Sequence, residues 1–236
     1  MPELRIFEDL EALSIAACEA AVHLIDDALS RQERCSLVLS GGHTPRRFYT
    51  LLASRFGERR QWQRIHVFWG DERYVPHTDP LSNYRMAKET LLDHVPCPAE
   101  NVHPMPTHFG DPGLAAREYE LTLRRSFDGE WPRFDLVLLG LGDDGHTASL
   151  FPGSPALEER TRWAVATEAP KPPHARLTLT LPVFNAAANA YFLVEGASKQ
   201  LALRHILSGL HAHHPAADIE LRNGAVVWWV DRAAAP

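Results

Sequence analysis

The segment GLGDDGH at residues 140–146 gathers the residue types needed for acid–base chemistry into one short turn. A neutral imidazole titrates near neutral pH, so His146 is well suited to take a proton from a water molecule. Asp144 precedes it closely and could cap a following helix or hold the ring in one orientation. Gly145 makes the turn between them flexible. We therefore predict that His146 is a general base and that Asp144 and Gly145 belong to the same site.

Two less specific interpretations of this segment stay open when its residues are read alone. A single histidine is more often structural than catalytic, and the GxG turn at 140–142 also resembles part of a dinucleotide-binding fingerprint. The full GxGxxG spacing is absent, because residues 143–146 read Asp-Asp-Gly-His. We expect His146 to begin a short helix that also carries Ser149. No nucleophilic serine is expected, because Ser149 has no evident base and no GxSxG motif occurs.

A second segment, SGGHTPRRF at residues 40–48, has the composition of an anion-binding turn before a helix. Gly41 and Gly42 allow the backbone to turn sharply and to approach a ligand closely. We expect Thr44 to cap the following helix and Pro45 to take its first position, where a missing N–H costs nothing. The free N–H groups and the positive end of the helix dipole then favour a phosphate. An ordinary strand-to-helix turn is an equally good interpretation of this segment alone.

The third polar segment, residues 70–84, places charged side chains directly after an expected strand. Arg73 carries a planar guanidinium that suits carboxylate, phosphate or hydroxyl oxygens. Ser82 is expected to cap the next helix, and Asn83 follows it at the helix start. The charges from Asp71 to Arg73 could also form a structural ion-pair cluster, an alternative that the residues leave open.

Short apolar runs alternate with amphipathic stretches along the chain, which is typical of an α/β fold. We predict strands at residues 36–39, 65–69, 135–141, 164–167, 177–181, 190–195 and 225–230. We predict helices at residues 9–31, 45–56, 82–94, 114–127 and 199–208. In an open parallel sheet, the loops at the carboxyl ends of the strands converge on one crevice where ligands bind. The three polar segments should therefore meet there.

Composition and length limit the class of protein. No repeat or linker divides the 236 residues, so we predict a single domain over 1–236, with the proline clusters at 96–106 and 170–173 in surface loops. The acidic, interrupted N-terminus excludes a secretory signal, and no stretch is apolar enough for a membrane span. The net charge of −6 argues against nucleic-acid binding. Three isolated cysteines favour reduced thiols, and hence a cytoplasmic protein.

Five blocks of the sequence together resemble the 6-phosphogluconolactonase family and run in family order over most of the chain. They are SGGHTP at 40–45, GDERYVP at 70–76, SNYRM at 82–86, GLGDDGHTASLFPG at 140–153 and RLTLTLP at 176–182. The resemblance implies a Rossmann-like, mainly parallel sheet flanked by helices, related to amino-sugar-phosphate deaminases and ribose-phosphate isomerases. It also implies hydrolysis of 6-phospho-D-glucono-1,5-lactone in the oxidative pentose phosphate pathway, without a metal or cofactor.

The resemblance further assigns roles to individual residues. His146 matches the catalytic histidine of the family, and Arg46 receives no firm role. Residues that match phosphate-contacting positions are Gly42, Thr44 and Lys199. Residues that match the sugar end of the site are Asp71, Arg73, Asn83 and Arg176. The implied partner is a small phosphorylated sugar lactone, with neither nucleic acid nor membrane, and we expect a monomer or a weak homodimer.

Two other functions fit parts of the same pattern. An amino-sugar-phosphate deaminase would share the SGG and DGH segments, but we would expect an aromatic residue in place of Arg73 and an Asn-Glu-Pro run in place of residues 150–152. A non-catalytic sugar-phosphate sensor would need a DNA-binding module. No helix-turn-helix fits, since the first strand is expected at residue 36 after a single helix. The HAHH run at 211–214 invites a metal interpretation, but no carboxylate or cysteine spacing completes a site.

Overall fold

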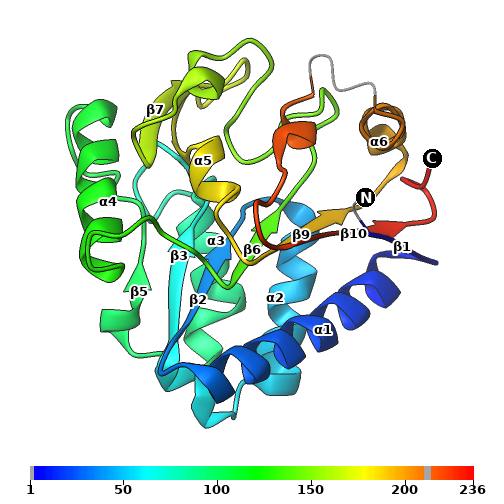
Figure 1. Cartoon of the computed structure of the whole chain (residues 1–236), viewed down its shortest axis with the longest axis horizontal. Helices are drawn as coiled ribbons and strands as arrows, with labels where there is room; N and C mark the ends of the chain where they lie inside the picture. The colour runs from blue at the N-terminus through cyan, green and yellow to red at the C-terminus, as the bar shows by residue number, and fades with distance from the viewer. Residues whose placement is uncertain (1–2, 210–213) are drawn as a thin grey trace.

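The computed structural model describes residues 3–209 and 214–236 and is built on a seven-stranded sheet (Figure 1). Every pair of neighbouring strands in this sheet is parallel, in the order β1-β10-β9-β6-β2-β3-β5. The strands are β1 (Glu3–Phe7), β2 (Cys35–Leu39), β3 (Ile65–Trp69), β5 (Val102–His103), β6 (Leu136–Leu139), β9 (Asn189–Val194) and β10 (Ala225–Asp231). The mainly parallel α/β fold predicted from the sequence is therefore confirmed.

A second, smaller sheet holds the remaining three strands in antiparallel order β4-β8-β7. These strands are β4 (Asp71–Arg73), β7 (Ala164–Glu168) and β8 (Ala175–Leu179). Because Gly70 alone separates β4 from β3, the chain passes directly from the main sheet into the small one. The charged residues after β3 are thus part of a strand rather than of an open loop, and their positions are fixed by pairing with β8.

Helices cover the sheets on both sides. They are α1 (Leu10–Arg31), α2 (His43–Phe56), α3 (Asn83–Thr90), α4 (Pro112–Ser126), α5 (Leu181–Phe184) and α6 (Gln200–Leu207). Short 3-10 helices lie at Arg60–Arg64, Leu92–His94, Ala99–Asn101, Pro155–Glu158, Ala197–Lys199 and Pro215–Asp218. Helices α1 and α2 pack side by side against the main sheet, and α4 packs on the small sheet (Figure 1). Across residues 3–209 and 214–236, no helix combines the length and apolar character of a membrane span.

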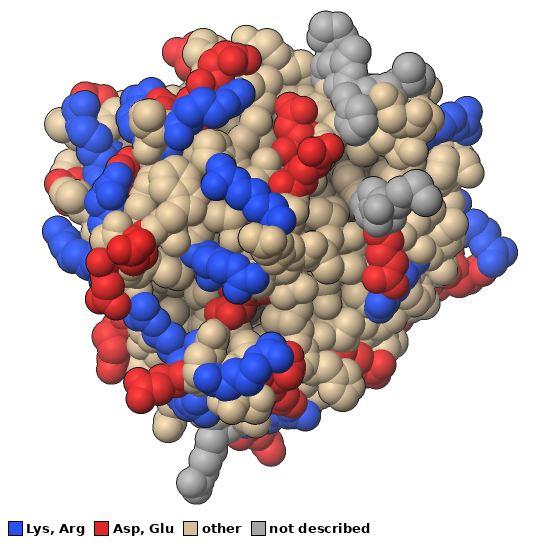
Figure 2. Space-filling model, in the orientation of Figure 1, with Lys and Arg blue, Asp and Glu red and all other residues tan. Residues whose placement is uncertain are grey.

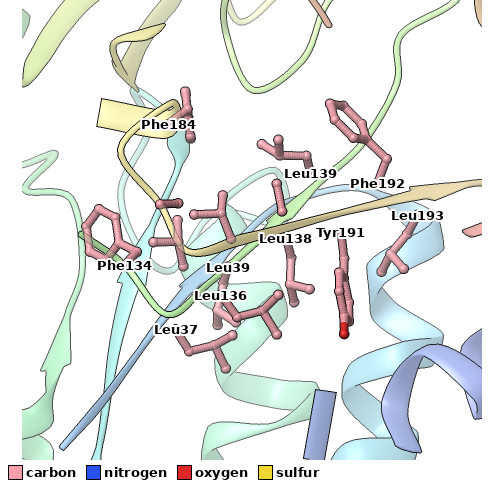
Figure 3. Close-up of a cluster of buried hydrophobic side chains, with 14 of the residues drawn as sticks. Leu37, Leu39, Phe134, Leu136, Leu138, Leu139, Phe184, Tyr191, Phe192 and Leu193 are labelled. Atoms are coloured by element: carbon pink, nitrogen blue, oxygen red, sulfur yellow. The ribbon is translucent and has the colours of Figure 1, made fainter. Parts of the chain in front are cut away.

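The main sheet is buried on both faces. Phe184, Leu139 and Phe192 lie on one side of it, whereas Leu138 and Tyr191 lie on the other (Figure 3). Side chains of successive strand residues point to opposite faces, so a sheet covered twice favours apolar residues at successive positions. This explains the apolar runs at residues 37–39 of β2 and 136–139 of β6, whereas Ser36 of β2 is bonded to Asp135.

Several sequence-based boundaries were wrong for identifiable reasons. The first strand is β1, not the strand near residue 36, and it pairs with β10 from the other end of the chain. Its half-exposed edge position gives it no continuous apolar run. The helix expected over 82–94 ends at Thr90 and resumes as one 3-10 turn from Leu92. The strand expected over 135–141 is limited to β6, because the glycines that follow it leave the sheet.

Two buried tyrosines anchor the backbone where β2 and β3 end. The hydroxyl of Tyr49, on α2, accepts a hydrogen bond from the N–H of Ser40 at 2.9 Å and donates to its carbonyl at 2.8 Å. The hydroxyl of Tyr119, on α4, makes the same two bonds to Trp69, at 2.9 and 3.1 Å. Buried backbone polar groups must find hydrogen-bond partners. At each strand end, one tyrosine hydroxyl is the partner of both the N–H and the carbonyl group. The strand ends are thereby held in place beside the polar segments.

Replacement of Tyr49 by Phe should leave both backbone groups of Ser40 without their partner. We expect the free energy of unfolding to fall by about 1–3 kcal/mol, the usual cost of burying unsatisfied polar groups. Urea denaturation measures this change. Tyr191→Phe is the matched control, because the Tyr191 hydroxyl has no hydrogen-bond partner within the described part of the chain. Equal stability losses in the two variants would contradict the assigned role of Tyr49.

Candidate active site

A cavity of about 350 Å³ lies at the carboxyl ends of β2, β6 and β9. All three polar segments reach it, so their predicted convergence is confirmed. Its walls include eight of the residues singled out from the sequence: Gly41, Gly42, Thr44, Asp71, Arg73, Asn83, His146 and Lys199. His146 and Thr44 thus line the same cavity.

A second cavity, of about 470 Å³, adjoins the first and shares several residues with it. The shared residues are Asp71, Arg73, Gly142, His146, Ala148 and Lys199. Asp144 and Arg176 line this second cavity. Gly145 lines neither cavity; it packs against the imidazole of His214, where an added β-carbon would lie 2.2 Å from Nδ1. Residues 211–213 of the HAHH run lie outside the described residues.

The first turn of α2 forms one wall of the first cavity. The helix starts at His43 with Gly42 as its N-cap, so the expectation that Thr44 caps the helix and Pro45 begins it was wrong. Gly42 has φ of +105°, a conformation that a residue with a side chain rarely adopts, and it makes no side-chain cap bond. Because no side chain caps this helix start, its free N–H groups can bind an anion.

Carboxylates of the chain itself lie beside the cationic and hydroxyl groups of this cavity. The Nζ of Lys199 donates to Asp143 Oδ1, and this contact is the main cause that lowers the pKa of Asp143. The Thr44 hydroxyl lies 3.4 Å from Oε2 of Glu195, the residue that directly follows β9. The sequence assigned no role to either carboxylate, although Asp143 belongs to the GLGDDGH turn. Glu195 could have been found, since it stands at the carboxyl end of an expected parallel strand.

The His146 imidazole is held by the carboxylate of Asp144. Its Nδ1 lies 2.5 Å from Asp144 Oδ1, which also accepts the backbone N–H of His146 at 3.1 Å. Burial raises the pKa of Asp144, but the hydrogen bonds from His146 outweigh it and leave the pKa below its ordinary value. Gly142 allows the ring to fold back over the turn, since a β-carbon there would lie 2.0 Å from Nδ1. The ring also packs on Phe151, with centroids 4.7 Å apart.

The turn around His146 does not continue into a helix, so that expectation was wrong. Residues 147–150 instead form a turn closed by a bridge between Thr147 and Leu150. The Thr147 hydroxyl donates to the carbonyl of Gly140 at 2.8 Å and ties the turn back to the end of β6. Asp144 therefore has no helix to cap and serves to orient the ring.

Ser149, Asp71 and Asn83 form a buried polar cluster in the walls of the two cavities. The Ser149 hydroxyl donates to Asp71 Oδ2 at 2.6 Å, and Asn83 Nδ2 donates to the Asp71 carbonyl at 3.0 Å. Each of the three side chains is less than one-tenth exposed. The Ser149 hydroxyl therefore holds Asp71 in position, and the expectation that Ser149 is not a nucleophile stays a prediction.

Glu72 is the buried residue that joins β4 to the start of α3. Its carboxylate accepts the backbone N–H groups of Asn83 at 2.7 Å and Tyr84 at 2.8 Å, the hydroxyl of Ser82 at 3.1 Å, and the N–H of Arg73 at 2.7 Å. Burial raises its pKa to about 7 although these donors act in the opposite direction. Ser82 caps α3 as predicted. Glu72 thus fixes both Arg73 and Asn83 relative to the cavity.

Arg73 and Arg176 stand opposite each other on β4 and β8. Burial first, and the charge of Arg73 second, lower the pKa of Arg176. The Nε of Arg176 and the Oδ1 of Asn83 are buried without a hydrogen-bond partner in the described part of the chain. Two neighbouring cations and unpaired polar atoms at the cavity walls are suited to an anionic ligand rich in hydroxyl groups.

Positive charge in these cavities is a local feature. Blue Lys and Arg side chains and red Asp and Glu side chains are interspersed over the face seen in Figure 2. With a net charge of −6, the whole molecule does not attract anions. Attraction for a small anion must therefore come from the grouped side chains of Arg73, Arg176 and Lys199.

Comparison with known proteins gives a consistent result over nearly the whole chain. The sequence model described as glucosamine-6-phosphate isomerases/6-phosphogluconolactonase matches residues 8–228. A 6-phosphogluconolactonase of Synechocystis sp. is 42% identical over 238 residues, which cover 99% of this chain and 97% of the relative. The crystal structure of 6-phosphogluconolactonase from Thermotoga maritima has a TM-score of 0.87 and 31% identity, with 98% and 100% of the two chains covered.

A more distant structure, a monomeric glucosamine-6-phosphate deaminase, has a TM-score of 0.81 at 23% identity and covers 98% of each chain. This likeness shows the shared fold.

The raised pKa of Glu72 predicts a specific pH dependence of stability. The ordinary pKa of a glutamate is 4.5, and the pKa of Glu72 in the folded protein is about 7. Between these two pH values, the folded protein holds the Glu72 proton more tightly than the unfolded chain. The contribution of Glu72 is therefore fully present below pH 4.5 and is lost as the pH rises through about 7. Glu72→Gln resembles the protonated acid, so we expect wild type to lose up to about 3 kcal/mol relative to this variant across that window.

Urea denaturation at pH 5, 6, 7 and 8 measures this difference. Glu158→Gln removes the same charge from an exposed side chain and is the control for net charge. A pH-independent difference between wild type and Glu72→Gln would show that the carboxyl is ionised throughout.

Proposed function

Because the chain belongs to the glucosamine-6-phosphate isomerase/6-phosphogluconolactonase family, we propose that it hydrolyses 6-phospho-D-glucono-1,5-lactone to 6-phosphogluconate. The observation that carries this proposal is the position of His146, held by Asp144, on a cavity that also contains Thr44 and Lys199. A cavity that contains both a general base and anion-binding groups is suited to hydrolysis of an ester that carries a phosphate. The cytoplasmic location, the single domain and the monomeric or weakly dimeric state stay predictions.

His146 acts as the general base in this proposal. An ionised carboxylate only accepts hydrogen bonds, so the short contact with Asp144 requires the proton on Nδ1 of the ring. The lone pair then lies on Nε2, which can take a proton from a water molecule next to the lactone carbonyl. The resulting imidazolium, stabilised by Asp144, returns the proton to the ring oxygen as the ester bond breaks.

The phosphate is held at the first turn of α2. Gly42 leaves the N–H groups of this turn free, the Thr44 hydroxyl points to the same cavity, and Lys199 adds a positive charge. A bound phosphate fixes the far end of the substrate, so remote binding energy positions the lactone carbonyl near His146.

Arg73 and Arg176 are assigned to the lactone end. The tetrahedral intermediate carries an oxyanion that needs hydrogen-bond donors aimed at it. Arg73 uses one nitrogen for the carbonyl of Leu81 at 2.7 Å, which fixes the guanidinium and leaves other N–H groups for the ligand. Asp71 and Asn83, fixed by Ser149 and Glu72, are suited to the sugar hydroxyls.

His146→Ala should fold and bind 6-phosphogluconate while its kcat falls by roughly 10²- to 10⁴-fold, the usual contribution of a general base. Lactone hydrolysis is measured at slightly acidic pH through 6-phosphogluconate formation, with spontaneous ring opening subtracted. Calorimetric titration with 6-phosphogluconate tests binding. His23→Ala, a change on the exposed face of α1, is the control and should retain full turnover.

A near wild-type kcat in His146→Ala would exclude His146 as the base. Ammonia released by the wild-type protein from glucosamine 6-phosphate, without lactone hydrolysis, would instead identify a deaminase.

A further inference from the structure

Glu195 forms part of the same cavity wall as Thr44. It directly follows β9, lines the first cavity, and has a side chain that is 28% exposed. Its Oε2 lies 3.4 Å from the Thr44 hydroxyl and 3.3 Å from Nδ1 of His43. A carboxylate at this place carries the same sign of charge as the phosphate that the wall is proposed to hold.

Whether a carboxylate competes with a ligand depends on how many protons the shared donor can offer. The Thr44 hydroxyl has a single proton, so it can donate either to Glu195 or to a phosphate oxygen, but not to both. The Lys199 ammonium has three, so it can keep its contact with Asp143 and still bind a phosphate. Of these two contacts, only the one between Thr44 and Glu195 must be broken.

We propose that Glu195 is a specificity-determining residue that sets the affinity of this cavity for phosphate by competing for the Thr44 hydroxyl. When phosphate binds, the Glu195 carboxylate leaves Thr44 and keeps only its contact with His43. The proposal rests on the proposed function, because it takes the wall at Thr44 as the place of the substrate phosphate.

His43 is suited to be the second partner of Glu195. Its imidazole is 79% exposed, and its Nδ1 already lies within ion-pair distance of the carboxylate. An exposed side chain can follow a small movement of Glu195 at little cost, since few of its contacts are fixed by packing. His43 therefore lowers the cost of releasing Thr44.

The first experiment measures the affinity of the full-length protein for inorganic phosphate by calorimetric titration at low ionic strength. Removal of a like charge beside the ligand in Glu195→Gln should tighten binding roughly three- to tenfold. Glu158→Gln lowers the net negative charge equally, but its carboxylate is on an 86% exposed side chain, so it should leave phosphate affinity unchanged. Unchanged or weaker binding in Glu195→Gln would overturn the proposal.

A double-mutant cycle tests the exchange between Thr44 and His43. His43→Ala should weaken phosphate binding in the wild-type background, because Glu195 loses its second partner, and should have little effect in the Glu195→Gln background. Equal weakening in both backgrounds would mean that His43 binds phosphate directly, which contradicts the exchange.

The lactone assay separates this proposal from the proposed function. Glu195 faces the phosphate in both the ground state and the transition state, so its effect should fall on KM rather than on kcat. If Glu195→Gln binds phosphate more tightly but the wild-type protein hydrolyses no lactone, the inference about Glu195 stands and the proposed function is wrong. If Glu195→Gln hydrolyses the lactone with an unaltered KM and an unaltered affinity for phosphate, the proposed function stands and the inference about Glu195 is wrong.

Discussion

The common direction of β2, β6 and β9 is the constraint on which the whole site depends. Parallel strands place their carboxyl ends at one edge of a sheet, so the turns that follow them meet although they are far apart in sequence. The glycine turn after β2, the His146 turn after β6 and the segment from Glu195 to Lys199 after β9 all meet in this way. Reversal of any one strand would carry its turn to the opposite edge of the sheet.

Buried hydrogen bonds convert this approximate convergence into fixed positions. A strand end loses its sheet partners, and each unpaired buried group there is costly. Tyr49 and Tyr119 supply the missing partners at Ser40 and Trp69. Glu72 does the same for the start of α3. The scaffold beside the cavity is therefore rigid where ligand-facing groups begin, which keeps the cost of ordering them low when a ligand binds.

Carboxylates of the chain contact several of the groups that line the cavity. Lys199 is paired with Asp143, Thr44 with Glu195, and His146 with Asp144, whereas Arg73 and Arg176 repel each other. An incoming anion gains most where cations are poorly compensated and least where a carboxylate is already in place. In our proposal, the distribution of these carboxylates, rather than the number of basic residues, sets how strongly each part of a phosphorylated ligand is held.

The sequence by itself determined the fold class and eight of the residues that line the first cavity. Apolar runs followed by glycine turns mark β2 and β6, because a sheet covered on both faces favours apolar residues and because the conformation of a turn depends on its own residues. Tertiary structure alone decided the pairing of β1 with β10 and the short β4 that sets Arg73 opposite Arg176, since strand pairing depends on residues distant in the chain.

Tertiary structure also decided the absence of a helix after His146, and it placed Glu195 against Thr44. We expected a helix there, but residues 147–150 form a turn that the Thr147 hydroxyl bonds to the carbonyl of Gly140. The sequence of a turn shows which side chains it carries. The partner of each side chain depends on strands that are distant in the sequence and meet only in the folded protein.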